Sequence, residues 1–348
     1  MNTDIDKFDS KVITVIRTVA MFCIVLCHLI IWFPEISFSA QIFNVGVPLF
    51  FIISGYLYGH KTIKNTWAWY GKQILKIVIP VYIYVILATV ALICFGRNAQ
   101  GWKLTDCLIF FFNLQGFLDG KTGNVVTMHL WFISFILLCY IITPLLDLSK
   151  RKIKVQTAKR IVIVLIIFEA VFVMSIKPFG FITQTVGVVS YIIAYYIGFF
   201  RDKRISRKFM IMLTVVTIVS LCVRLAVKYL DDSGNNILYS NIYERIIAPY
   251  THCILAYFIF FAIRFICMKY ERILEAVYPV CKIFDKYSYE VYIVHHMFIT
   301  GEISVEHIFE NMFFNVLLFA FLTAISAYIL HSVSEMFKKR PAPKKIKK

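Results

Sequence analysis

The segment VITVIRTVAMFCIVLCHLIIWF, residues 12–33, is an apolar stretch of the length that a helix needs to cross a bilayer. It carries one guanidinium, Arg17, and one imidazole, His28. The two residues are eleven positions apart, so in a helix they return to within about 20° of the same face, with roughly 16 Å of rise between them. Because such side chains are costly inside a membrane, each needs a partner or a function there.

The same apolar character recurs along the whole chain. Of its 348 residues, 60% are hydrophobic and only 16% are charged, against roughly a quarter charged in soluble domains. This composition predicts an all-α, polytopic transmembrane helix bundle of about ten helices over residues 1–337, followed by a polybasic cytoplasmic tail, 338–348. The predicted helices cover residues 12–33, 41–58, 73–95, 129–148, 160–176, 184–200, 209–230, 246–268, 286–301 and 311–335. A stretch around Cys107–Phe112 is too short to span and is expected to be interfacial or re-entrant.

The basic residues follow the predicted loops. The net charge of +17 is compatible with nucleic-acid binding, but its placement favours a membrane protein. With both termini cytoplasmic, the inside segments hold 28 of the 37 Lys and Arg residues, as the positive-inside rule requires. We therefore expect contact with an anionic inner leaflet and no nucleic-acid partner.

The nine cysteines do not indicate a metal site. None forms a C-x-x-C pair, and most lie in apolar runs, where cysteine acts as a small hydrophobic residue. No P-loop or dinucleotide-binding glycine motif is present. The sequence therefore predicts no bound metal.

Four motifs resemble those of one family. R-x10-H joins Arg17 to His28, and VGVPLFFIISGYLYG (45–59), MHLWFISFILLCYIITPLL (128–146) and SYEVYIVHHMFI (288–299) follow in order. Together they resemble the acyltransferase-3 family of bacterial integral membrane acyltransferases. The resemblance implies a protein of the bacterial plasma membrane that transfers an acyl group, commonly acetyl from acetyl-CoA, to a hydroxyl of a cell-surface polysaccharide. Pro48, where many members carry an acidic or small residue, fits the polysaccharide O-acetyltransferase subgroup.

The resemblance agrees with the chemistry of the first helix. We expect Arg17 to bind a phosphate or the polar arm of CoA entering from the cytoplasm. His28 would be the general base for the acceptor hydroxyl or, alternatively, a transient acyl carrier. Lys72 and Lys76, one turn apart, are candidates to supplement CoA binding, although positive-inside residues need no such role.

Two more histidines are catalytic candidates. His129 opens a helix beside Trp131, and the pair is expected either to bind the glycan acceptor, with His129 as a second base, or to form an interfacial belt. His295 and Tyr292 match the family's late Y-x-x-H helix, and this resemblance makes His295 a catalytic candidate and Tyr292 a substrate-binding candidate. His296 points about 100° away from His295 in a helix and is expected to be a packing residue.

The remaining intramembrane polar residues have weaker assignments. Glu169 and Arg224 are predicted to bind substrate by orienting an acceptor hydroxyl, and Arg224 is a possible partner of Glu169. Arg264 is expected to extend to the cytoplasmic interface. Ser54-Gly55 is expected to permit close helix packing rather than to supply a nucleophile.

Two other classes of function remain open. Ten helices with intramembrane charges also suit a transporter or flippase for a polysaccharide or lipid-linked sugar, and a non-catalytic sensor or scaffold is a third possibility. Arg17 and His28 on one helix face favour the enzyme, because transporters more often show broken helices in paired halves.

Overall fold

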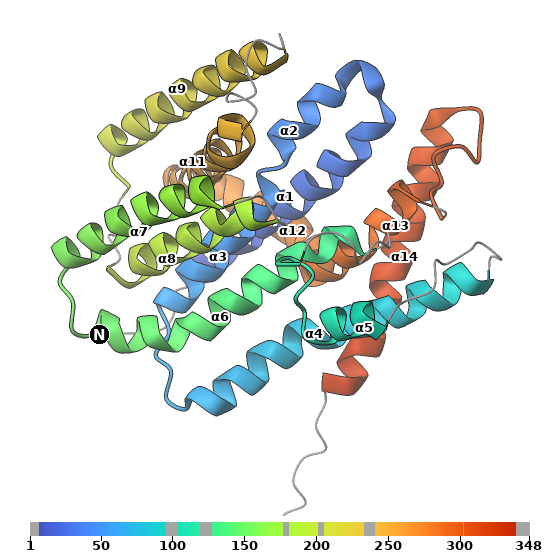
Figure 1. Cartoon of the computed structure of the whole chain (residues 1–348), viewed down its shortest axis with the longest axis horizontal. Helices are drawn as coiled ribbons and strands as arrows, with labels where there is room; N and C mark the ends of the chain where they lie inside the picture. The colour runs from blue at the N-terminus through green and yellow to red at the C-terminus, as the bar shows by residue number, and fades with distance from the viewer. Residues whose placement is uncertain are drawn as a thin grey trace, which may run out of the picture.

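The structure is a computed structural model that describes residues 7–94, 104–118, 127–176, 181–200, 205–232, 241–301 and 303–338. Within these ranges the chain is helical, with no strand (Figure 1). The long helices are α1 (Lys7–Leu29), α3 (Gly46–Gly59), α4 (Thr66–Cys94), α6 (Trp131–Lys150), α7 (Val155–Ser175), α8 (Val186–Phe200), α9 (Arg207–Asp232), α11 (Ala248–Lys269), α12 (Glu271–Val294) and α14 (Met312–Lys338). The shorter helices are α2 (Ala40–Phe43), α5 (Leu104–Phe111) and α13 (His296–Ile299), and a π-helix covers Tyr243–Ile247.

The helices confirm the predicted polytopic all-α bundle. Eight helical segments of the described chain are long and apolar enough to cross a membrane. The surface agrees, because α9 exposes large apolar side chains such as Leu225, which is 68% accessible, and lipid is the solvent that can cover them. The predicted tail lies outside the described residues, apart from Lys338.

Several predicted boundaries differ from those of the structure, and the largest difference is at α12. Residues 269–286 were expected to form a cytoplasmic loop before a helix at 286–301, but α12 already begins at Glu271. The reason is that the first half of α12 is amphipathic, with charged residues on one face, so its mean hydropathy does not distinguish it from a loop. This half-helix packs on α1 and forms part of the site described below.

Helices α1 and α12 run side by side in the same direction, and we call their contact the α1–α12 seam. Near its start Lys11 Nζ lies 2.6 Å from Glu275 Oε1. Farther along, Thr18 Oγ1 donates to the Cys281 carbonyl at 3.0 Å. The seam therefore brings residues more than 260 positions apart into register.

Helices α3 and α8 approach each other through glycines. A Cβ on Gly55 would lie 2.2 Å from the Tyr191 carbonyl oxygen, and one on Gly59 would lie 2.2 Å from that of Tyr195. Only glycine lets the two backbones come this close. The contact supports the predicted packing role of Ser54-Gly55.

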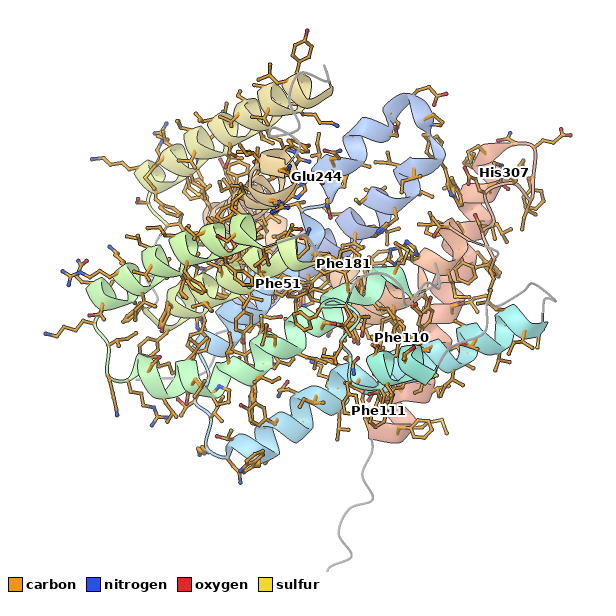
Figure 2. The ribbon with its side chains drawn as sticks, viewed as in Figure 1. Phe51, Phe110, Phe111, Phe181, Glu244 and His307 are labelled. Atoms are coloured by element: carbon orange, nitrogen blue, oxygen red, sulfur yellow. The ribbon has the colours of Figure 1, made fainter. Side chains whose placement is uncertain are left out.

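The segment 104–118 contacts the bundle rather than crossing it. Phe111 of α5 stacks on Tyr82 of α4, with ring centroids 6.2 Å apart, and Figure 2 shows Phe110 and Phe111 beside α4. After α5 the chain reverses at Asn113, whose φ of 54° is the left-handed conformation that Asn adopts more readily than most residues. Gly116 N–H then donates to Ser134 Oγ of α6 at 2.8 Å. The segment therefore folds back against α4 and α6, and its position at the interface or within the membrane stays a prediction; we call residues 104–118 the re-entrant segment.

Candidate functional site

His28 contacts His295 at one end of the α1–α12 seam. His28 lies in the last turn of α1, and His295 follows the last residue of α12. His28 Nδ1 and His295 Nε2 are 3.0 Å apart. His295 is fully buried, whereas His28 is partly exposed. The seam therefore joins two of the three histidines that the sequence assigned to catalysis.

Backbone carbonyls determine where the protons lie on both rings. His295 Nδ1 is 2.8 Å from the Tyr292 carbonyl oxygen, which only accepts hydrogen bonds, so Nδ1 carries the proton. In the neutral ring, Nε2 of His295 then accepts a hydrogen bond from Nδ1–H of His28. The same Nδ1–H lies 3.1 Å from the Ile24 carbonyl oxygen. This assignment leaves a lone pair on Nε2 of His28, as a general base requires.

Two further rings complete a four-histidine cluster of His28, His129, His295 and His296, which we call the histidine cluster. The His129 ring stacks on that of His296 with centroids 4.7 Å apart. The His296 ring also lies 5.0 Å from the His28 ring, edge to face. His296, expected to be a packing residue, packs against the rings of His28 and His129, because rings from α1 and from the start of α6 approach this chain segment from different sides. Residues 100° apart on it can therefore both face the cluster.

His129 is held to α12 by two hydrogen bonds. Its Nε2–H donates to the Ile293 carbonyl at 2.8 Å, and its own carbonyl accepts from the Tyr292 hydroxyl at 2.5 Å. Nδ1 of His129 is buried and has no hydrogen-bond partner among the described residues. The Tyr292 side chain thus positions His129, and the His129 ring keeps a second lone pair in the cluster.

Arg17 lies on the seam between the Lys11–Glu275 ion pair and the His28–His295 contact. Its Nε is 3.3 Å from Asp285 Oδ1 of α12, and its side chain is 33% exposed. Arg17 and His28 therefore both contact α12, as their eleven-residue spacing predicts. Their functional roles stay predictions.

Lysines near Arg17 complete what we call the basic cluster, Arg17, Lys61, Lys72 and Lys76. Lys76 lies within electrostatic range of the cations Arg17, Lys61 and Lys338, and of the carboxylates of Glu290 and Asp285. In the loop after α3, burial, together with the charge of Lys72, lowers the pKa of Lys61. Among the described residues no carboxylate forms an ion pair with Lys61, Lys72 or Lys76. The cluster is thus an excess of positive charge that an anion would stabilise.

Glu169 and Arg224 are not brought together. Glu169 accepts hydrogen bonds from the hydroxyls of Tyr250, at 2.5 Å, and Thr185, at 2.8 Å. Arg224 instead contacts His252 Nε2 at 2.6 Å and donates to Gln41 Oε1 at 2.7 Å. Among the described residues neither side chain contacts the histidine cluster, so their assignment to substrate binding has no support from its geometry.

Arg264 does not extend to the interface as expected. It is 4% exposed, and its Nη2 lies 2.8 Å from Asp9 Oδ1. Its guanidinium also lies 5.0 Å from the centre of the Tyr56 ring. The first turn of α1 packs into the bundle and supplies the acid that the sequence did not place there. A buried, paired arginine has no need to reach the interface.

Trp131 forms an aromatic pair beside His129. Its ring stacks on Phe181, with centroids 5.2 Å apart and planes 17° from parallel, and Figure 2 shows Phe181 near the middle of the bundle. The sequence named Trp131 as a substrate-binding candidate but gave no sign of Phe181, which belongs to a different part of the chain.

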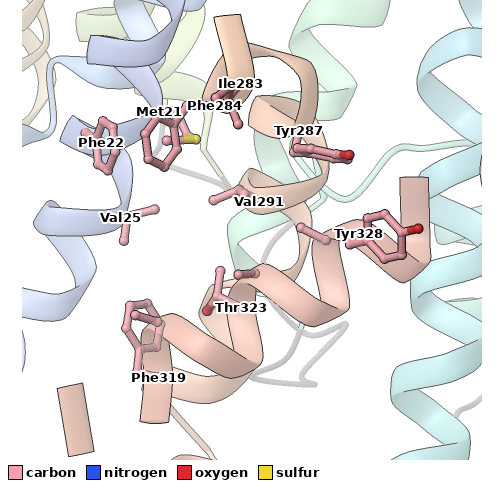
Figure 3. A pocket seen from close by; sticks show the side chains of 13 residues that line it. Met21, Phe22, Val25, Ile283, Phe284, Tyr287, Val291, Phe319, Thr323 and Tyr328 are labelled. Carbon is pink, nitrogen blue, oxygen red and sulfur yellow. The ribbon is translucent and has the colours of Figure 1, made fainter. Parts of the chain in front are cut away.

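An apolar groove lies along the seam toward α14 (Figure 3). Its volume is about 360 Å³, and its lining includes Met21, Val25 and Val291 but no charged side chain. Phe22, which also lines it, is 41% exposed, so the groove opens at the surface. It suits hydrocarbon and offers no charge for a phosphate.

Sequence reasoning missed Asp285 and His296. The sequence did contain a pattern that could have identified Asp285. Asp285 precedes His295 by ten residues, which is nearly the eleven-residue spacing of Arg17 and His28. Two helices packed in parallel with matched spacings bring both pairs together. His296 had no such signal.

The sequence matches the model of one known protein family. The acyltransferase domain family matches residues 11–332, which include every residue of the histidine and basic clusters. No curated protein and no solved structure matches the chain. Because the family match covers nearly the whole sequence, the chain belongs to the acyltransferase-3 family of membrane acyltransferases.

Proposed function

We propose that this membrane acyltransferase transfers acetyl from cytoplasmic acetyl-CoA to a hydroxyl of a cell-surface or exported polysaccharide in the bacterial plasma membrane. The observation that carries the proposal is the His28–His295 hydrogen bond, which leaves a lone pair on Nε2 of His28. A neutral imidazole with one nitrogen fixed and the other open is suited to accept a proton from a hydroxyl.

The basic cluster supports CoA as the donor. CoA carries several phosphate charges, and Arg17 with Lys61, Lys72 and Lys76 offers positive charge without paired carboxylates at the three lysines. These residues belong to segments that the positive-inside rule assigns to the cytoplasmic side, where acetyl-CoA is found. Arg17 and His28 are separated by roughly 16 Å of helix, a distance that the extended pantetheine arm is suited to cover.

The reaction follows from these positions. His28 Nε2 removes the proton from the acceptor hydroxyl as the oxygen attacks the thioester carbonyl. The carbon–sulfur bond then breaks, and the CoA thiolate leaves and takes the proton back from His28. His295 accepts the hydrogen bond from Nδ1–H throughout, and this stabilises the imidazolium that forms. No acyl-enzyme is needed, and the step needs no metal.

Transfer of labelled acetyl by the purified protein tests the proposal. We expect acetyl from labelled acetyl-CoA to appear on isolated envelope glycan, and we expect His28→Ala to abolish the transfer while the protein still inserts in the membrane. Glycan translocation without acetyl transfer would favour a transporter instead. Full activity of the His28→Ala variant would remove His28 from the mechanism.

A further inference from the structure

Three buried hydrogen-bond acceptors lie in or next to the re-entrant segment without a partner among the described residues. They are Asn113 Oδ1, Gln115 Oε1 and His129 Nδ1. The three residues are 5%, 4% and 5% exposed. Buried polar atoms are nearly always paired with protein or water. Of the eleven buried side-chain atoms without a hydrogen bond among the described residues, these three acceptors belong to adjoining segments, so a bound hydroxyl group would satisfy them.

Hydrogen bonds tie this region together. Gln115 Nε2 donates to the carbonyl of Leu130, the residue after His129, at 3.1 Å. The Gly116 carbonyl accepts from Phe181 N–H at 3.1 Å, and a Cβ on Gly116 would lie 2.6 Å from the Trp131 carbonyl oxygen. The re-entrant segment, the start of α6 and Phe181 therefore form one packed unit beside the histidine cluster.

The open atoms specify the chemistry of the ligand. The amide of Gln115 is oriented by its bond to Leu130, so its oxygen is the atom left without a partner. The amide of Asn113 is oriented in the same way by its Nδ2, which lies 3.3 Å from the Tyr82 hydroxyl. All three open atoms accept hydrogen bonds, so they call for a ligand with several O–H or N–H donors and no negative charge.

The Trp131–Phe181 pair further restricts the chemical class of the ligand. Trp131 and Phe181 stack on each other, and the Phe181 backbone bonds to Gly116, the residue after Gln115, so this aromatic pair lies in the same packed unit and offers an apolar surface. A pyranose ring combines both needs, because its hydroxyls donate hydrogen bonds while its C–H face packs on an aromatic ring. The pantetheine arm is a weaker fit, since it would enter from the basic cluster around Arg17 and not from the end of the seam where His28 lies.

We propose that Asn113, Gln115 and His129, with Trp131 and Phe181, form the subsite for a neutral pyranose unit of the acceptor, held through its hydroxyls. This inference rests on the proposed acyl transfer and adds the re-entrant segment as the element that selects the acceptor. Gln115 Oε1 accepts a hydrogen bond from one sugar hydroxyl, and Nδ1 of His129 accepts a hydrogen bond from another hydroxyl of the sugar.

Steady-state kinetics with methyl pyranosides as soluble acceptors test the subsite. Gln115→Leu keeps the side chain's approximate size and removes its oxygen, so we expect the KM for the pyranoside to rise about tenfold, with the KM for acetyl-CoA unchanged. Asn113→Gly tolerates the left-handed backbone and is expected to raise the pyranoside KM in the same direction.

Gln73→Leu is the matched control. Gln73 is also buried, but its Oε1 already accepts from the Tyr58 hydroxyl at 2.6 Å, so we expect its pyranoside KM to stay within about twofold of wild type. If both subsite variants also stay within about twofold, or if wild type acetylates no pyranoside, the subsite is wrong. Transfer to isolated envelope glycan decides the proposed function separately, because that assay does not depend on these variants.

Discussion

His295 helps to hold His28 in one tautomer. Its Nδ1 donates to the Tyr292 carbonyl, so its Nε2 must accept, and the proton of His28 is thereby held on Nδ1. The Ile24 carbonyl oxygen, 3.1 Å away, also holds this proton on Nδ1, so His295 adds a second acceptor that stabilises the imidazolium formed when His28 takes up a proton. His295 is in this sense a positioning residue for the proposed base.

Replacing His295 tests this role. We expect His295→Leu to lower kcat roughly 10²-fold, at the lower end of what a general base contributes, with both KM values unchanged. His295→Asn should recover part of the loss, because its amide oxygen can accept from Nδ1–H. Equal kcat values for the Leu and Asn variants would show that the side chain only fills space.

At the residue level the helix period predicted that Arg17 and His28 face the same neighbouring helix. It could not predict the partners of Glu169 and Arg224. The spacing of Arg17 and His28 required them to share a face, and both do contact α12. The partners of Glu169 and Arg224 could not be predicted, because they come from helices whose relative rotation is set by tertiary packing. The open atoms of Asn113 and Gln115 are visible only once the fold is known.

Among the elements, the α3–α8 contact holds the middle of the bundle together. Its glycines bring two backbones within van der Waals distance, and large buried rings such as Phe51 and Tyr191 pack around them. Helices in a membrane gain stability from close packing rather than from burial away from water. We therefore expect this contact to be sensitive to a single added methyl group.

Gly55→Ala tests the contact. The new Cβ would lie 2.2 Å from the Tyr191 carbonyl oxygen, so the helices must separate, and we expect a loss of roughly 1–3 kcal/mol of stability. The measurement is the thermal unfolding midpoint of the purified protein in detergent. Gly71→Ala is the control, because a Cβ added there would have no neighbouring atom within 4 Å. Similar midpoints for both variants would contradict the packing account.

Hydropathy predicted most of these elements but not the first half of α12. Long apolar runs such as α4 have a mean hydropathy high enough to predict a transmembrane helix directly. The segment from Glu271 to Asp285 mixes charged and apolar residues, and it becomes helical where α1 supplies partners for both kinds. Its structure depends on a neighbour more than 250 residues away, which no local window can detect.

Across the whole molecule, the seam connects two chemically different clusters. The basic cluster lies on the side that the charge distribution assigns to the cytoplasm, and the histidine cluster lies at the far end of the seam. The donor and the acceptor would therefore approach from opposite sides of the membrane and meet at His28. An acetyl group, and not the whole sugar or CoA, would cross the bilayer.

Acetyl transfer across a sealed membrane tests this claim most directly. Protein in liposomes is given labelled acetyl-CoA outside, with the glycan acceptor enclosed, so that only molecules with their cytoplasmic side outward can act. We predict that the enclosed glycan becomes labelled, and that Arg17→Ala or His28→Ala prevents this. Labelling that occurs only when the donor and the glycan share one compartment would contradict the account.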